Sequence, residues 1–203
     1  YQTLADEKSR DLLVNLLCYR ILGPRRVEIS GVYQRWPDVV RQMRRLRIAG
    51  RKKVVGPGPL ATVEQFQWPT NHENIRLFCH PLNLINTFCL EQYATEISEG
   101  KIEVRPGDVV VDGGGCWGDT ALYFAEKAGK EGKVHVFEFS RLNLGLLNQN
   151  LSLNPDLADR IRLYNFALSD RTGQQLCFEE AGAGTHLEPS GGNCQATTKT
   201  IDD

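Results

Sequence analysis

The sequence lacks any apolar run near the roughly 20 residues that a membrane-spanning helix needs. Its six cysteines include no CxxC pair and fall short of the density of a disulfide-stabilised domain. A net charge of −1 and a hydrophobic content of 41% exclude extreme electrostatics and extensive disorder. These absences predict a soluble globular chain in a reducing, cytoplasmic location. The chain starts at Tyr1 and shows no signal peptide, so we expect a trimmed piece of a longer protein.

The most informative stretch is VVVDGGGCWGDT, residues 109–120. Three β-branched apolar residues in a row predict a buried parallel strand, which ends at Asp112. The chain then passes Gly113 and Gly114 and reaches Gly118, after which apolar residues recur with helical spacing. A strand, a glycine-rich turn and a helix are typical of the phosphate- or nucleoside-binding start of a doubly wound α/β fold. Glycine lets a ligand approach the backbone, and the helix directs its positive end at that ligand.

The apolar pattern also predicts several other elements. We expect helices over residues 4–22, 36–48, 81–93 and 142–153, and strands over residues 75–78, 133–138, 160–166, 175–178 and 196–201. The first two helices are expected to end at Gly23 and Gly50, with Pro37 in the first turn of the second. We expect them to bury Leu12, Leu13, Leu16, Leu17 and Ile21, and Val39, Val40, Met43 and Leu46, respectively. Residues 181–192 are predicted to form a mobile loop.

Composition divides the chain into three parts. The run Gly56-Pro57-Gly58-Pro59 is typical of a linker. We therefore expect an N-terminal helical extension over residues 1–55, a linker and lead-in segment over residues 56–100, and a cofactor-binding half-domain over residues 101–203.

Positive charge is concentrated before the linker. Eleven basic residues and only two acids lie between Arg20 and Lys53. One interpretation is a patch for a polyanion, a nucleotide-linked substrate or an anionic membrane surface. The other is a solvated helix face followed by a flexible basic loop. We favour the second because aromatic residues are not interleaved with the basic ones.

Two cysteines and two histidines lie close together in the lead-in segment. Cys79, His80 and Cys89, with His72 nearby, invite a metal hypothesis. Their spacings do not match the usual zinc arrangements, so we expect no metal and interpret both cysteines as core residues.

Glu138 closes the second predicted strand, 20 residues after Gly118. Neighbouring parallel strands end at the same sheet edge, so this acid is expected beside the glycine turn. A carboxylate there accepts hydrogen bonds from both hydroxyls of a ribose, which predicts an adenosine-containing ligand. The alternative is a surface glutamate at a strand end.

Two ligand classes use such an arrangement. Residues 113–118 formally satisfy the GxGxxG dinucleotide fingerprint, so a nicotinamide-dependent oxidoreductase is a competing interpretation. Asp112, however, would repel a pyrophosphate resting on the turn. A carboxylate suits the sulfonium and α-ammonium groups of S-adenosylmethionine, so Asp112 favours a methyltransferase.

The segments VRPGDVVVDGGGCWG (residues 104–118), VFE (136–138), ALSD (167–170) and TKTIDD (198–203) resemble the FkbM-type S-adenosylmethionine-dependent methyltransferases. The resemblance covers most of residues 90–203 and implies a Rossmann-like class I sheet. It departs from the family at Cys116 and Trp117, and at Phe139 and Arg141. The predicted cofactor-binding residues are Asp112, Gly113, Gly114, Gly118, Thr120, Glu138, Phe139, Asn143, Phe166 and Ala167.

The resemblance also implies O-methylation of a sugar, polysaccharide or natural-product hydroxyl, with no nucleic-acid partner. The family continues beyond the aspartate pair that ends this chain, so we expect a C-terminally truncated sheet. Its Val109 strand would then have an open edge, through which two copies of the chain could pair. A non-catalytic cofactor-binding or interaction module is a third interpretation.

No catalytic base can be assigned from the sequence. His186, in the predicted loop, is the histidine we would test, whereas His135 lies inside a strand and is expected in the core. Cys116 stands near a helix N-terminus that would lower its pKa, which raises the hypothesis of a nucleophile. We favour a pocket-lining role for this cysteine.

Overall fold

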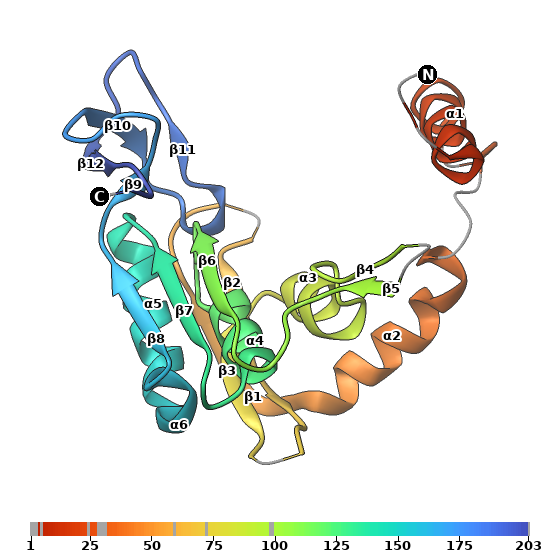
Figure 1. Ribbon diagram of the computed structural model, residues 1–203, viewed down its shortest axis with the longest axis horizontal. Helices are drawn as coiled ribbons and strands as arrows, with labels where there is room; N and C mark the ends of the chain where they lie inside the picture. The colour runs from red at the N-terminus through yellow and green to blue at the C-terminus, as the bar shows by residue number, and fades with distance from the viewer. Residues whose placement is uncertain are drawn as a thin grey trace. The chain divides into compact units, whose positions relative to one another are not determined.

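The computed structural model (Figure 1) describes residues 4, 6–23, 25–27, 32–58, 60–71, 73–97 and 100–202, and only the backbone of residues 32–35. The chain divides into two compact units, Tyr1–Arg45 and Leu46–Asp203. The division thus falls ahead of the glycine–proline run at which the sequence suggested a boundary. None of the described helices is long and apolar enough to cross a membrane.

The first unit contains α1 (Glu7–Leu22) and most of α2 (Val32–Leu46). The Asp6 carboxylate caps α1 by accepting from the Ser9 N–H at 2.8 Å, and Gly23 ends the helix as predicted, at φ +80°. The expected buried face of α1 is wrong, because none of its described residues is buried. Its large apolar side chains, such as Leu17 and Ile21, are exposed.

The predicted bounds of the second helix are also wrong. α2 begins at Val32, so Pro37 lies inside it, and it ends at Leu46. The next residue starts β1 (Arg47–Val54). Gly50 is therefore not a helix stop. It has φ +72° and lies where the pairing of β1 with its neighbour shifts register, a conformation that glycine adopts without strain.

An antiparallel sheet of β1, β2 (Thr62–Trp68) and β3 (Ile75–Cys79) opens the second unit, in that order. The predicted strand over residues 75–78 is confirmed. Gly56 and Gly58 lie in the turn that joins β1 to β2, where the Val55 N–H donates to the Ala61 carbonyl at 2.8 Å. The described part of the glycine–proline run thus connects two paired strands.

A short helical segment and a hairpin lead into the central strand. α3 (Pro81–Leu84) passes into a π-helical turn, η1 (Ile85–Cys89), and β4 (Thr95–Ile97) pairs with β5 (Gly100–Ile102). The predicted helix over residues 81–93 therefore ends at Cys89, and its second half is π-helical. Cys79 is buried, in agreement with its predicted place in the core.

The parallel sheet is formed by β6 (Val109–Gly113), β7 (Lys133–Phe137) and β8 (Ile161–Tyr164), in that order. α4 (Asp119–Ala128) follows β6, and α5 (Arg141–Ser152) and the short α6 (Pro155–Ala158) follow β7 (Figure 1). These elements confirm the mixed α/β class and the predicted strand–turn–helix. Among the described residues, β6 pairs with β7 alone.

The two faces of the parallel sheet differ in burial. Val134 and Val136 of β7 are fully buried, and α4 contacts both β6 and β7. On β6, Val109 is 67% exposed and Val111 is 47% exposed. The prediction of a strand covered on both faces is therefore wrong, since no described helix covers these two valines.

The helices also pack against the antiparallel sheet. Trp117, at the end of the glycine turn, is fully buried with Val63 of β2, Phe78 of β3 and Leu146 of α5. This cluster joins β1–β3 to the glycine turn and to α5. It places a large aromatic side chain directly behind the turn.

A small sheet ends the described chain. Its strand order is β11 (His186–Leu187), β10 (Gln175–Glu179), β12 (Cys194–Lys199) and β9 (Ala167–Leu168), and a 3-10 turn, η2 (Gly182–Gly184), precedes β11. Part of the predicted mobile loop is thus structured, because β11 pairs with β10.

Candidate functional site

Backbone hydrogen bonds hold the turn after β6 closed, both within the turn and to the end of β7. The N–H groups of Gly114 and Gly115 both donate to the Phe137 carbonyl, at 2.8 and 3.1 Å, and the Gly118 N–H donates to the Gly115 carbonyl at 2.7 Å. These three N–H groups are therefore engaged within the protein. A turn that cradles a diphosphate needs such groups free to face the ligand.

The glycines of this turn serve different purposes. A Cβ on Gly115 would lie 2.2 Å from Cγ1 of Val136, so packing requires glycine there. Gly118, at φ +80°, precedes α4 and faces Leu147 of α5. Gly114 has φ +97°, and a Cβ there would meet nothing within 4 Å. The open side of the turn is therefore at Gly114.

Asp112, in β6 just before the turn, is buried, and its Oδ2 would lie 3.6 Å from a Cβ on Gly115. Its Oδ2 accepts a hydrogen bond from Oγ1 of Thr120, in the first turn of α4, at 2.7 Å. Burial raises the pKa of Asp112 to about 6, with smaller contributions from the charges of Asp119 and Glu138, while the Thr120 bond opposes the rise. This carboxylate is consequently ionised at neutral pH and short of compensating donors.

Glu138 follows β7 and is 5% exposed. Its Oε2 accepts from the Cys116 N–H at 2.9 Å, and its Oε1 accepts from the Ser140 N–H at 2.7 Å. The predicted meeting of the glycine turn and the strand-end acid is thus confirmed. Burial raises the pKa of Glu138, and hydrogen bonds from Ser140, Cys116 and Asn143 partly oppose this.

The N-terminus of α5 lies against Glu138. Ser140 caps the helix, with its Oγ accepting from the Asn143 N–H at 3.3 Å. Glu180, far away in sequence, accepts from Ser140 Oγ at 2.7 Å and from the Leu142 N–H at 3.0 Å. Our sequence analysis missed both residues. A serine directly before an apolar helical pattern could have indicated Ser140 as an N-cap, whereas no local pattern indicates Glu180.

Two of the predicted cofactor-binding residues, Phe139 and Ala167, lie in a separate apolar cluster. Phe139 packs edge-on against Phe178, with ring centroids 4.9 Å apart, and Ala167 is buried in the same cluster. Phe166 is half-buried, with Nζ of Lys199 4.9 Å from its ring centroid. Gly113 approaches this region, since a Cβ there would lie 3.2 Å from Cδ1 of Leu168. The predicted residues thus form a polar group around Asp112 and Glu138 and an apolar group around Phe139.

Asp119 is a third buried acid, which our sequence analysis did not single out. It is the first residue of α4, and it accepts from Nδ2 of Asn83 at 3.4 Å and from Oγ1 of Thr87 at 3.3 Å. Burial raises its pKa. The ionised carboxylate of Asp112, with Asp119 and Glu138 nearby, favours a cationic ligand group over an anionic one at the turn.

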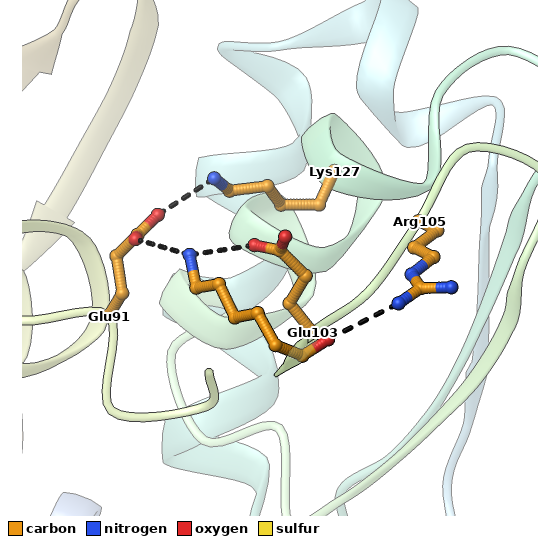
Figure 2. A network of polar contacts seen from close by, with 5 residues as sticks. Glu91, Glu103, Arg105 and Lys127 are labelled. Carbon is orange, nitrogen blue, oxygen red and sulfur yellow. Dashed lines mark hydrogen bonds and ion pairs between the residues drawn. The ribbon is translucent and has the colours of Figure 1, made fainter. Parts of the chain in front are cut away.

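An ion-pair cluster anchors the segment that precedes β6 (Figure 2). Glu91 pairs with Lys127 of α4 at 2.7 Å and with Lys101 at 3.3 Å, and Lys101 also pairs with Glu103 at 2.8 Å. The Arg105 guanidinium donates to the Lys101 carbonyl at 3.2 Å. The cluster fixes the β4–β5 hairpin to the helix that carries Asp119 and Thr120.

The hypothesis of a nucleophilic Cys116 is wrong. Burial raises the pKa of its thiol, and the charges of Asp119 and Glu138 raise it further. Burial and the nearby acids outweigh the helix N-terminus, so the thiol stays protonated at neutral pH. Cys116 has φ +44° and contributes its N–H to the site.

None of the histidines that the structure describes hydrogen-bonds to these acids. His186 is exposed, and its Nδ1 lies 3.1 Å from the Gly184 carbonyl. His135 is half-buried rather than in the core, and it stacks on Tyr164. His72, part of the metal hypothesis, lies outside the described residues. No group of three or more metal-ligating side chains is found in the part of the chain that the structure describes.

The basic residues after α2 belong to a strand, so the expected flexible loop is wrong. Arg47 and Lys52 pair with Glu64 at 3.3 and 2.7 Å. Lys53 donates to Oε1 of Gln149 at 2.5 Å. The Glu64 carboxylate therefore offsets part of the positive charge that β1 offers to a polyanion.

A cavity of about 530 Å³ lies at the opposite end of the sheet from Asp112. Pro106 and Gly129, which line it, precede β6 and follow α4. Ligands of doubly wound folds bind at the carboxyl ends of the strands, so we place the site at Asp112 and Glu138 on their chemistry.

No family model and no curated protein matches this sequence. Solved structures with partial similarity include *P. horikoshii* TYW2 in complex with MeSAdo, at 21% identity over 54% of this chain and 39% of that one, with a TM-score of 0.36. *Aeropyrum pernix* fibrillarin with natively bound S-adenosyl-L-methionine is 18% identical over 57% of this chain and 45% of that one, at a TM-score of 0.33. A SAM-dependent O-methyltransferase from *Thermotoga maritima* is 16% identical over 61% of this chain and 52% of that one, at a TM-score of 0.31.

The chain thus spans about half or less of each of these three structures. Such partial overlap assigns no function, and the functional assignment depends on the side chains of the site.

Proposed function

We propose that this chain binds S-adenosylmethionine and forms the cofactor-binding part of a class I methyltransferase. The predicted residues Asp112, Gly113, Gly114, Gly118 and Thr120 would surround the methionine end, Glu138 and Asn143 the ribose, and Phe139, Phe166 and Ala167 the adenine.

The observation that carries this proposal is the setting of Glu138. Its carboxylate is buried at the carboxyl edge of the sheet and accepts from the N–H groups of Cys116 and Ser140 and from Asn143. An ionised carboxylate in this position suits a ribose hydroxyl donor. The neighbouring Asn143 Oδ1 is buried and has no hydrogen-bond partner among the described residues. A buried acceptor without a donor is costly, so both residues fit a ligand that supplies hydroxyl donors.

The hydrogen bonds and charge at the turn favour S-adenosylmethionine over a dinucleotide. A dinucleotide would place its pyrophosphate against N–H groups that already donate to Phe137 and Gly115. It would also bring two negative charges towards Asp112. The sulfonium and α-ammonium groups of S-adenosylmethionine carry positive charge, which Asp112 stabilises. The nicotinamide-dependent alternative is therefore disfavoured.

When bound, the cofactor supplies an electrophilic methyl group for attack by an acceptor. The residues of this chain would bind and orient it, because transfer of this kind depends mainly on positioning and on exclusion of water. We further propose, from the FkbM resemblance, that the acceptor is a hydroxyl of a sugar, polysaccharide or natural product.

The proposal is tested by calorimetric titration with S-adenosylhomocysteine, with NAD in parallel. We expect S-adenosylhomocysteine to bind and Glu138→Ala to weaken binding by at least about tenfold, because each charge-assisted bond contributes roughly 1.5–3 kcal/mol. Glu131→Ala is the matched control, since Glu131 is exposed and lies at the opposite end of β7.

Binding of NAD but not S-adenosylhomocysteine would overturn the proposal, as would unchanged affinity in Glu138→Ala. Transfer of a tritiated methyl group to glycan or small-molecule acceptors would then test the hydroxyl acceptor. Cofactor binding without turnover of any acceptor would favour the non-catalytic binding module.

A further inference from the structure

Glu180 makes two long-range hydrogen bonds beside the candidate ribose site. It follows β10, and its Oε1 accepts from Oγ of Ser140 at 2.7 Å and from the N–H of Leu142 at 3.0 Å. Both donors belong to the N-terminus of α5. One carboxylate oxygen therefore holds the cap and the first turn of this helix together.

Ser140 links Glu180 to the acid proposed to bind ribose. Its N–H donates to Oε1 of Glu138 at 2.7 Å, and its Oγ accepts from the Asn143 N–H at 3.3 Å. A serine hydroxyl has one proton, and donating it to Glu180 leaves the oxygen lone pairs for the Asn143 N–H. Glu180 thus fixes the orientation of the Ser140 side chain.

The segment that carries Glu180 is itself held in place. The Ala181 N–H donates to Oγ1 of Thr185 at 3.1 Å, and this hydroxyl donates to the Gly182 carbonyl at 2.7 Å. Gly182 has φ +60°, and a Cβ there would lie 3.0 Å from the Val55 carbonyl oxygen. The turn after Glu180 is therefore tightly packed against the start of the β1–β2 turn.

The charge of Glu180 suits this position. Burial acts to raise its pKa, but hydrogen bonds from Leu142, Ser140 and Arg141, with the positive charge of Arg141, leave the pKa below its usual range. The side chain is consequently ionised at neutral pH. A negative charge at a helix N-terminus is favourable, and hydrogen bonds to an ionised acceptor are stronger than neutral ones.

We propose that Glu180 is a positioning residue for ribose recognition, because it holds Ser140, whose N–H in turn fixes the Glu138 carboxylate for the ribose hydroxyls. This inference rests on the proposed cofactor. It assigns a role in ligand selectivity to the hairpin of β10 and β11, whose Phe178 packs against Phe139. Glu180 acts through Ser140 and Glu138 and does not touch the nucleoside.

The test measures selectivity for ribose. Adenosine and 2′,3′-dideoxyadenosine compete with S-adenosylhomocysteine in calorimetric titrations of the full chain, and the ratio of their affinities is compared between variants. We expect the wild type to prefer adenosine by at least about tenfold, and Glu180→Ala to reduce that preference to about threefold or less. Glu180→Gln retains an acceptor oxygen and should keep most of the preference.

Glu188→Ala is the matched control, because Glu188 lies in the same hairpin and its carboxylate bonds to Ser190 in its own turn. General loosening of the fold would weaken both nucleosides alike and leave the ratio unchanged. Ser140→Ala breaks the same link from the other side, and it gives the same comparison if Glu180→Ala fails to fold.

If Glu180→Ala keeps the full preference for adenosine, this inference is overturned and the proposed function is not. Where Glu180→Ala does not fold, the same result in Ser140→Ala has the same meaning. Failure of the wild type to bind S-adenosylhomocysteine or either nucleoside would overturn the proposed function, and this inference with it. Loss of the preference in Glu180→Ala, with retention in Glu188→Ala, would establish the positioning role.

Discussion

Asn150 and Phe78 form a reciprocal pair of hydrogen bonds although they lie far apart in sequence. Oδ1 of Asn150 accepts from the Phe78 N–H at 2.7 Å, and its Nδ2 donates to the Phe78 carbonyl at 2.8 Å. Just past the end of α5, Asn154, the N-cap residue of α6, makes the same pair of bonds with Arg76, at 2.9 and 2.6 Å. The two side-chain amides therefore bond to the edge of β3 as a neighbouring strand would.

We predict that Asn150→Ala lowers the free energy of unfolding by about 3 kcal/mol or more. Asn150 is fully buried, and its Nδ2 also donates to the Trp117 carbonyl at 2.8 Å. The substitution leaves one N–H and two carbonyls without partners, each costing roughly 1–3 kcal/mol. Urea denaturation would measure the change.

The variant Asn150→Asp tests whether the two N–H donations of the side chain are needed. It keeps an acceptor for Phe78 but sets a carboxylate against two carbonyl oxygens, so we expect it to be at least as destabilising at neutral pH. Asn148→Ala is the control, since Asn148 is exposed and donates only to the Leu144 carbonyl within α5. A stable Asn150→Asp variant would contradict the assigned role.

The glycine turn provides a second prediction, because Gly115 and Gly114 differ in their surroundings. Gly115→Ala would drive a methyl group to 2.2 Å from Val136, and we expect it to lower the free energy of unfolding by about 3 kcal/mol. Gly114→Ala meets no atom within 4 Å and carries only the strain of φ +97°, about 1–2 kcal/mol.

For ligand binding, we expect the substitution at Gly114 to act directly on the site, whereas the one at Gly115 acts through stability. The methyl group of Gly114→Ala points into the open side of the turn and should weaken S-adenosylhomocysteine binding in a protein that remains folded. Urea denaturation and calorimetry on both variants would check this pair of effects. A Gly114→Ala variant less stable than Gly115→Ala would contradict the assignment.

The sequence predicts the strand–turn–helix over residues 109–128 and the meeting of Glu138 with the turn, because these features depend on local patterns. An apolar run, a glycine turn and a helical period each concern residues that are neighbours in the chain. Gly23 and Gly129, both at positive φ after a helix, end their helices for the same local reason.

Burial and long-range contacts were not predictable in this way. The valines of β6 indicate a strand by their β-branched shape, but the shape does not say whether a helix covers them. The basic residues of β1 do not favour a strand, and their pairing with β2 decides it. Glu180, Asn150 and Asn154 act on backbone groups of distant segments, which no spacing in the sequence reveals.

The ion-pair cluster in Figure 2 leads to a third prediction, concerning salt dependence. Glu91→Gln removes the charge that pairs with Lys127 and Lys101, and we expect it to lower the free energy of unfolding by about 0.5–1 kcal/mol at low salt. All three side chains are about one third exposed, so 1 M salt should remove most of the effect.

Asp170→Asn is the matched control for this cluster. Asp170 lies 4.0 Å from Arg171, and both side chains are largely exposed, so its removal should change little. Chemical denaturation by urea at two salt concentrations would compare the variants. An effect of Glu91→Gln that persists in 1 M salt would show that the cluster acts through packing instead of charge.

The last prediction concerns the buried charge of Asp112, which we expect to lower the stability of the fold and to strengthen ligand binding. Burial raises its pKa from the ordinary value of 3.8 to about 6. The folded state therefore binds a proton more tightly than the unfolded state does. Ionised Asp112 opposes folding above about pH 6, by roughly 3 kcal/mol from a shift of about two units, and this cost disappears as the pH falls towards 4.

Asp112→Asn removes the buried charge and keeps an oxygen to accept from Thr120. We expect this variant to match the wild type in stability near pH 4 and to exceed it by up to about 3 kcal/mol at pH 8. Urea denaturation at a series of pH values would give the difference at each pH, so that other titrating groups cancel. Asp108→Asn, at an exposed acid that accepts from the Arg105 N–H, should show no comparable pH-dependent gain.

The same variant should bind S-adenosylhomocysteine more weakly at pH 8, because the α-ammonium group loses its charged partner. In the wild type, affinity should rise with pH through about 6 as Asp112 ionises, and Asp112→Asn should remove that rise. Calorimetry across this range would measure both trends. A variant that gains stability and loses this pH dependence would show that the site retains a destabilising charge for its ligand, whereas a stability difference constant with pH would exclude the buried charge as its cause.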